Sequence, residues 1–228
     1  MNLNINEYFE QTEMSLSDWD FLLDSGWDRV GDYFFRRQYD RYELMFLNEV
    51  FSMPMQLMPL RYRLSAGYAF PKSHRIIQKR NADLHRIYRP AFIDQEKVDL
   101  FNAWYSSRFQ TENSIFTWVS GNQLPFPSYE VSIYKLDKLI ACSFFDVVPT
   151  AQYSTLAMFD PEEAKRSLGT YSLISEIEFG LRRRKKYHYP GHAYYESSMY
   201  DYKKRFVNAE AFDWHNQDWR PIARLMDI

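Results

Sequence analysis

A strand, a loop that contains a glycine, a helix and a second strand follow one another between residues 153 and 189. Residues 153–159 read as a strand that ends at Asp160-Pro161, and residues 187–189 read as another short strand. Between them, apolar residues recur at three- and four-residue spacing, which predicts one apolar stripe on a helix: Leu168, Tyr171, Ile174, Ile177 and Leu181. The free N–H groups and the dipole of the first helical turn favour a phosphate, so this unit predicts an anion-binding site.

The loop before this helix, Arg166-Ser167-Leu168-Gly169, resembles the Arg-x-x-Gly pyrophosphate loop of the N-acetyltransferase (GNAT) fold. An ordinary crossover between strands, with a glycine at the turn, would explain the same residues. Upstream, residues 129–136 and 139–148 predict a hairpin, which strand 152–159 continues into an antiparallel meander. We therefore predict an α+β chain with a GNAT-like acyltransferase fold, in which helices flank a mixed, mostly antiparallel sheet. A cleft is expected between strands 152–159 and 187–190.

The composition fits a globular protein, since 46% of the 228 residues are hydrophobic and 25% are charged. No apolar run approaches the ~18–20 residues that a membrane span needs, and residues 1–7 lack the features of a secretory signal. The lone cysteine, Cys142, excludes an intramolecular disulfide and a cysteine-based metal site, and its apolar neighbours predict that it is buried. These features predict a cytoplasmic protein without contact to a membrane, and we expect a monomer.

The net charge of −2 conceals an uneven distribution of charge along the chain. Residues 1–50 carry eleven acids and four Lys or Arg, whereas residues 51–110 carry four acids and ten Lys or Arg. In the most basic stretch, Lys72, Arg75 and Lys79 are three and four residues apart, so they share one face of a predicted helix. This face suits a phosphate backbone, although a merely solvated helix face has the same pattern.

Short motifs in a fixed order resemble the aminoacyl-tRNA–protein transferases, the family of the eukaryotic arginyl-tRNA–protein transferase and its bacterial leucyl-transferring relatives. The motifs extend from about Gly26 to Trp214 and are Gly26-Trp27-Asp28-Arg29-Val30-Gly31, Pro59-Leu60-Arg61, Ser73-His74-Arg75, Arg80-Asn81-Ala82-Asp83-Leu84, Asp146-Val147-Val148, Phe159-Asp160-Pro161, Ser167-Leu168-Gly169-Thr170-Tyr171, Pro190-Gly191 and Tyr200-Asp201-Tyr202-Lys203-Lys204-Arg205-Phe206. The resemblance implies a GNAT-like transferase domain at residues 71–228, with a divergent N-terminal region, residues 1–70, packed on it.

The chain departs from the family where the family carries cysteines. The Cys-x-x-Cys that precedes the family's Pro-x-Arg corresponds here to Pro54 and Leu57, and the N-terminal cysteine motif is absent. We therefore expect no metal and no cofactor other than the donor substrate, and the identity of the acceptor stays open. At the end of the chain, Tyr200 replaces the family's usual methionine, and His192 stands where an aromatic residue is common.

Aminoacyl transfer needs a group that removes a proton from the attacking amine, because the ester on tRNA is already activated. Asp146 is our first candidate for this base, with Glu178 and His192 as alternatives; a capping or turn role next to Pro149 would equally explain Asp146. The resemblance and the phosphate chemistry together nominate residues that bind the aminoacyl-tRNA donor: Arg75, Lys79, Arg166, Ser167, Gly169, Thr170, Tyr171, Tyr202, Lys203 and Arg205.

The resemblance thus implies an enzyme that moves an amino acid from an aminoacyl-tRNA to the N-terminal amine of a protein. Two alternatives stay open. The same fold could use an acyl-CoA donor, with residues 166–170 on its pyrophosphate, or the chain could be a non-catalytic relative that binds tRNA or a peptide. The basic face at residues 72–89 favours tRNA, since coenzyme A needs no long basic track. Whether arginine, leucine or another amino acid is transferred stays undecided at this level.

Overall fold

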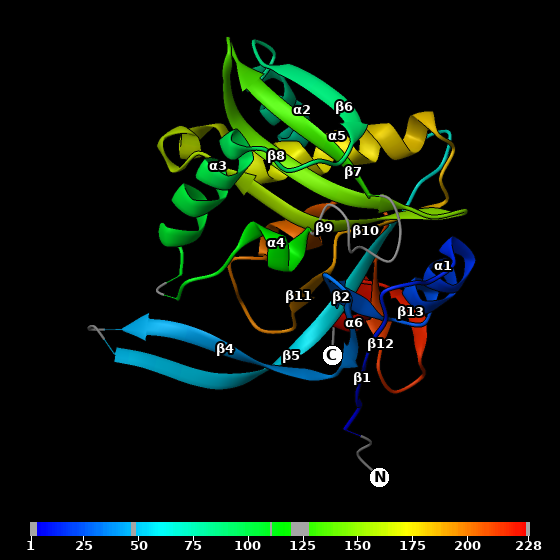
Figure 1. The fold of residues 1–228 in the computed structure, drawn as a ribbon. Coiled ribbons are helices and arrows are strands. Elements are labelled where there is room, and N and C mark those ends of the chain that lie inside the picture. Colours follow the sequence, from blue (N-terminus) through cyan, green and yellow to red (C-terminus); the bar gives the residue numbers. More distant parts are fainter. Residues whose placement is uncertain (1–3, 47–48, 110, 120–127, 227–228) are drawn as a thin grey trace.

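A ten-stranded mixed sheet forms the centre of the protein (Figure 1). The computed structural model describes residues 4–46, 49–109, 111–119 and 128–226. The strands of the sheet are β4 (Tyr39–Phe46), β5 (Glu49–Arg63), β6 (His85–Pro90), β7 (Ser128–Lys135), β8 (Lys138–Val147), β9 (Ala151–Phe159), β10 (Tyr187–Tyr189), β11 (His192–Tyr194), β12 (Ala209–Asp213) and β13 (Asp218–Pro221). Their main order is β13-β12-β5-β10-β9-β8-β7-β6, and β4 and β11 also pair with β5.

Helices and a small second sheet complete the fold. The helices are α1 (Leu16–Asp24), α2 (Lys72–Arg80), α3 (Gln95–Ser106), α4 (Ile115–Trp118), α5 (Leu168–Arg182) and α6 (Ala223–Met226), with short 3-10 helices η1 (Pro161–Arg166) and η2 (Asp201–Arg205). The second sheet has the order β1-β3-β2, from β1 (Asn6–Glu10), β2 (Asp28–Val30) and β3 (Tyr33–Arg37). This mixture of helices with a mostly antiparallel sheet confirms the predicted fold class.

The predicted meander and crossover are both present. Strands β7, β8 and β9 pair antiparallel in sequence, and α5 then leads to β10, which runs parallel to β9. That parallel pairing covers only Tyr187–Tyr189 against Ala151–Tyr153, so the rest of β9 has no partner strand on that side. The two strands therefore separate beyond residue 153, at the place where the sequence predicted a cleft.

Helices cover both faces of the meander, which explains why β8 is almost continuously buried. Ala141 and Phe145 of β8 pack in the same cluster as Leu168 and Tyr171 of α5. Cys142 and Phe144 point to the other face and pack with α3, so the prediction that the cysteine is buried is confirmed. Helix α5 is also buried more widely than one stripe, because α2 lies on its outer side and the sheet on its inner side.

The N-terminal region contributes directly to the main sheet. Strand β5 lies between β10 and β12 and pairs antiparallel with both. The proposed division at residue 70 therefore separates strands of one sheet. The β1-β3-β2 sheet and α1 form a smaller layer beside it, and Trp19 and Phe34 from this layer pack in one cluster with Tyr153 of β9.

A buried ion pair joins this smaller layer to the meander. The guanidinium of Arg29 on β2 donates from Nε and Nη2 to the two carboxylate oxygens of Asp146 on β8, at 2.8 and 2.7 Å. The same carboxylate accepts from Ser128 Oγ at 2.6 Å and from Trp19 Nε1 at 3.1 Å. Both charged side chains are completely buried.

This geometry corrects the expectation that Asp146 is the general base. Its two oxygens already accept four hydrogen bonds, and its side chain lies outside the residues that line the pocket described below. A carboxylate held in this way has no access to a substrate amine. Its role is to hold β2, α1 and β7 together.

We predict that Asp146→Ala lowers the free energy of unfolding by about 3–5 kcal/mol, because it leaves the Arg29 guanidinium buried without its counter-ion. Urea unfolding followed by circular dichroism measures this change. The matched control is Asp83→Ala, which removes a carboxylate that is more than half exposed and pairs with Arg166; its effect should be much smaller. Equal effects of the two substitutions would show that the buried pair does not hold the fold.

Candidate functional site

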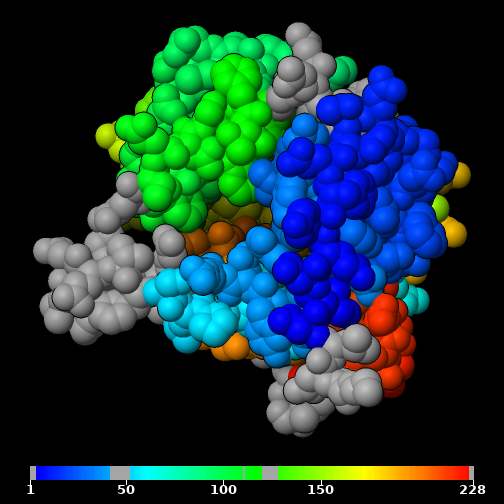
Figure 2. Space-filling view, turned by 60° about the horizontal axis from the view of Figure 1, so that its bottom comes forward, coloured from blue at the N-terminus to red at the C-terminus, as the bar shows by residue number. Residues whose placement is uncertain are grey.

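A pocket of about 680 Å³ opens where β9 separates from β10. Its walls come from β9, the N-terminal half of α5, the segment from Pro190 to Lys203, and the β2–β3 hairpin with α3 and α4 on the far side. In the space-filling view the recess lies between the green surface of α3 and α4 and the blue N-terminal strands, with the orange segment near residue 190 at its bottom (Figure 2). The predicted cleft is therefore present, and its side chains come from parts of the chain that are far apart in the sequence.

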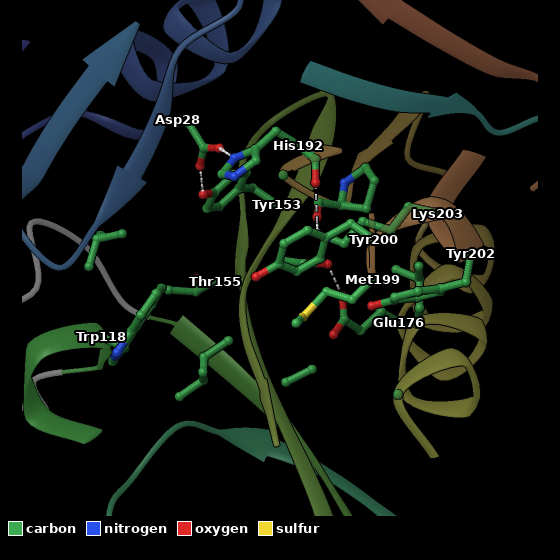
Figure 3. Close-up of a pocket in the computed structure, with 18 of the residues that line it drawn as sticks. Asp28, Trp118, Tyr153, Thr155, Glu176, His192, Met199, Tyr200, Tyr202 and Lys203 are labelled. Carbon is green, nitrogen blue, oxygen red and sulfur yellow. Dashed lines mark hydrogen bonds and ion pairs between the residues drawn. The ribbon is translucent and has the colours of Figure 1, made fainter. Parts of the chain in front are cut away.

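A histidine and an aspartate form a dyad at one end of the pocket (Figure 3). His192 Nδ1 lies 2.8 Å from Asp28 Oδ2, and the other oxygen of Asp28 accepts from the hydroxyl of Tyr153 and from the backbone N–H of Arg29. Burial opposes ionisation of Asp28, but the hydrogen bond and charge of His192, with those from Tyr153 and the Arg29 N–H, lower its pKa overall. The carboxylate of Asp28 is placed to accept from Nδ1–H of His192, and in that tautomer the lone pair of the imidazole lies on Nε2.

A second carboxyl group, that of Glu176, lies at the opposite end. Its side chain projects from α5 into the pocket wall and accepts a hydrogen bond from Ser154 Oγ on β9. Burial raises the pKa of Glu176 to about 7, and hydrogen bonds with Ser143 and Ser154 and the charge of Lys203 offset that only in part. Asp28 and Glu176 thus ionise over different pH ranges, because hydrogen bonds and the charge of His192 outweigh burial at Asp28, whereas burial dominates at Glu176.

Lys203 lies between these two ends (Figure 3). Its ammonium donates to the carbonyl oxygens of Pro190 at 2.8 Å and His192 at 3.1 Å, so it fixes the turn that leads into β11. Burial lowers its pKa to about 8, although the carboxylates of Asp28 and Glu176 oppose this shift. Gly191 sits in this turn with φ of +77°, a conformation that favours glycine.

The N-terminus of α5 lines the pocket, as the sequence predicted. Ser167 adopts a left-handed backbone conformation and α5 begins at Leu168, so the unpaired N–H groups of the first turn lie at the wall formed by Gly169 and Thr170. The guanidinium of Arg108 lies over the ring of Phe159, 4.8 Å from its centre, and also lines the pocket. In the described part of the chain, Arg108 has no carboxylate within 4 Å. A phosphate would find both helix N–H groups and a cation here.

The structure brings together about half of the nominated site residues. Those that line the pocket are Ser167, Gly169, Thr170, His192, Tyr202 and Lys203. Arg75, Lys79 and Arg205 are exposed outside it, so their proposed contacts with a tRNA body stay predictions.

Three nominated residues have side chains whose contacts are already made within the protein, so they are not available to a substrate. Glu178 accepts from Arg86 at 2.6 Å and from Gln78 at 2.7 Å on the other side of α5, so it is corrected from a candidate base to a structural contact. Arg166 binds Asp83 and Glu163, which leaves its guanidinium without a free edge for a pyrophosphate. Tyr171 is a buried core residue and has no face open for a nucleotide base.

Three residues of the pocket were not nominated from the sequence: Asp28, Glu176 and Arg108. Asp28 lies inside the motif Gly26–Gly31 that carries the family resemblance, so a signal for it was present. Glu176 follows Gly169 and Leu173 at four- and three-residue spacing, which places the three on one face of α5. For Arg108 no pattern in the sequence gave a signal.

The described residues contain neither a candidate metal site nor a helix that could span a membrane. Within residues 4–226, apart from the segments left undescribed, no group of three or more His, Cys, Asp or Glu could hold a metal ion. In the same residues no helix is both long enough and apolar enough to cross a membrane.

Comparisons with known proteins found related sequences and solved structures of limited similarity. An aspartate/glutamate leucyltransferase from Helicobacter hepaticus is 23% identical over 217 residues, which cover 91% of this chain and 84% of the relative. Another from Pseudomonas paraeruginosa is 27% identical over 161 residues, covering 68% and 67% of the two chains. Among solved structures, the C-terminal domain (DUF2156) of a putative lysylphosphatidylglycerol synthetase from Agrobacterium fabrum aligns with 69% of this chain and 49% of its own, at 12% identity and a TM-score of 0.46.

A family model confirms the resemblance that the short motifs indicated. It describes the C terminus of the arginine-tRNA-protein transferases and matches residues 80–213, a range that begins at the end of α2 and ends with β12. The matched range contains most of the pocket: β9, the N-terminus of α5, His192 and Lys203. Since the match covers more than half of the chain, the protein belongs to the arginine-tRNA-protein transferase family.

Proposed function

We propose that the protein transfers an amino acid from an aminoacyl-tRNA to the N-terminal amine of a protein, and that the pocket between β9 and β10 is its active site. The observation that carries the proposal is the combination, in one pocket, of a helix N-terminus suited to a phosphate with the Asp28–His192 dyad. The helix N-terminus suits a phosphate at the 3′ end of tRNA, and the dyad suits an amine that must lose a proton.

In this reading His192 takes the proton from the attacking amine. Asp28 holds Nδ1–H, so Nε2 accepts the proton, and the ionised Asp28 stabilises the imidazolium that forms. About a quarter of the His192 side chain is exposed, which allows the proton to leave to water afterwards. The positive charge of Lys203 is suited to stabilise the oxyanion that forms at the ester carbonyl.

The apolar part of the pocket favours a leucyl over an arginyl donor. Beyond the α5 N-terminus the wall includes Leu156, Ala157 and Leu173, from β9 and α5. Such a wall stabilises an aliphatic side chain, because contact with it removes apolar surface from water. The relatives from Helicobacter hepaticus and Pseudomonas paraeruginosa are named as leucyltransferases, which agrees with this choice.

Direct transfer tests the proposal. Incubation with total aminoacylated tRNA and peptides that differ in their N-terminal residue should increase the mass of some peptides by one leucine residue, as measured by mass spectrometry. The increase should depend on the aminoacyl ester and disappear with deacylated tRNA. Transfer from an acyl-CoA in place of aminoacyl-tRNA would instead support the acyl-CoA alternative and overturn the proposal.

The role of His192 makes a separate prediction. His192→Ala should reduce kcat by about 10²–10⁴-fold while binding of charged tRNA stays nearly unchanged, because the residue acts on the proton of the acceptor. Asp28→Asn should reduce kcat in the same direction, since it no longer fixes the tautomer of the ring. His85→Ala is the matched control, because His85 is exposed on β6, outside the pocket, and should keep full activity. Full turnover by His192→Ala would place the base elsewhere.

A further inference from the structure

One face of α5 runs along the wall of the pocket from its N-terminus to Glu176. Gly169, Leu173 and Glu176 all line the pocket and follow one another at helical spacing. Seven residues of helix span about 10 Å at 1.5 Å per residue. This length is close to the distance from the phosphate of a terminal nucleotide to the amine of an amino acid esterified on its ribose. A phosphate at the helix N-terminus would therefore bring that amine near Glu176.

Glu176 lacks a close cation in the described protein. Its side chain is only 1% exposed, and among the described residues no Lys or Arg nitrogen lies within 4 Å of its carboxylate. Nε2 of His188 lies 3.6 Å from Oε2 of Glu176. Burial, with the nearby charge of Lys203, lowers the pKa of His188 to about 3, so that ring is neutral at neutral pH. The site thus offers an enclosed carboxyl group that a bound cation would stabilise in its ionised form.

Aminoacyl transfer brings two amines into one pocket, and the two differ in whether they must lose a proton. The acceptor amine must lose a proton before it attacks, whereas the α-amine of the donor takes no part in the bond changes and can keep its proton. His192 is partly exposed and can release a proton to water, so it suits the acceptor. Glu176 is enclosed and hydrogen-bonded to Ser154, so it suits a group whose proton stays in place. The two ends of the pocket therefore match the two amines.

We propose that Glu176 binds the α-ammonium group of the donor amino acid and thereby restricts the enzyme to aminoacyl-tRNAs with a free α-amine. This proposal rests on the proposed function above. An N-acylated aminoacyl ester, such as an N-acetylated or a peptidyl ester, carries a neutral amide at this position. That amide would leave Glu176 without its cation and would place additional atoms against a closed wall, so such donors are rejected.

Binding of two matched analogues tests this role without turnover. The probes are a CCA trinucleotide whose terminal ribose carries leucine through a stable 3′-amide, and the same molecule with an N-acetylated leucine. Titration calorimetry at pH 7.5 should give about 10- to 100-fold tighter binding of the free amine to the wild-type protein, since a charge-assisted contact is lost on acetylation. In Glu176→Gln, which keeps the shape and the Ser154 hydrogen bond, the ratio should fall close to one.

The matched control is Glu178→Gln, two residues further along the same helix. Glu178 binds Arg86 and Gln78 outside the pocket, so this variant should keep the wild-type ratio. If Glu176 only supported the fold, Glu176→Gln would weaken both analogues equally and keep the ratio, which would overturn the proposal.

The ratio of the two analogue affinities for the wild-type protein tests the role of Glu176 even if Glu176→Gln does not fold. Equal binding of both analogues by the wild-type protein overturns the role of Glu176 and leaves the proposed function intact. Binding of neither analogue overturns both proposals, because it removes the donor site itself.

Discussion

The buried pair between Arg29 and Asp146 is the interaction on which the site depends. Asp28 and Arg29 are adjacent on β2, so the buried pair that fixes Arg29 also fixes Asp28 beside the pocket. The same carboxylate also holds Trp19 of α1 and Ser128 of β7. A single buried charge pair therefore places the N-terminal layer against the meander, and with it one half of the Asp28–His192 dyad. The cost of burying these charges is offset by hydrogen bonds to every oxygen of the carboxylate.

The separation of β9 from β10 provides the space for a substrate. Parallel pairing holds the two strands together for three residues only. Beyond it, β11 pairs with β5, and β9 continues toward the loop that precedes α5 with β8 as its remaining partner in the described sheet. The backbone of β9 and the first turn of α5 therefore both face the pocket. A sheet that stayed paired along its whole length would fill this region with side chains.

The pocket places two carboxyl groups in different surroundings and so gives them different properties. Asp28 accepts from His192, Tyr153 and a backbone N–H, and its pKa falls below the usual range. Burial dominates at Glu176, whose pKa rises to about 7 although Ser154 donates to its carboxyl group. Lys203 interacts with both through its charge and holds the backbone between them. This difference supports the assignment of the two groups to two different amines.

The local patterns of the sequence determined the elements of the fold. Alternating apolar residues predicted the meander, and three- and four-residue spacing predicted α5, because these signals depend on near neighbours in the chain. The pattern of strands and helix also predicted the cleft, and the family motifs contain two of its residues, Gly169 and Lys203. These features could be predicted because each lies on a single element, or on a motif of a few adjacent residues.

Only the tertiary structure decided which charged side chains are free to act. Asp146, Glu178 and Arg166 are reasonable candidates by residue type, yet each is occupied by partners about 80 to 120 residues away in the chain. Asp28 meets His192 across 164 residues, a pairing that no local pattern encodes. The sequence by itself determined which residues carry chemistry and on which elements they lie. The packing of distant elements decided which of them are neutralised in the interior and which face the pocket, because charge compensation depends on distance in space.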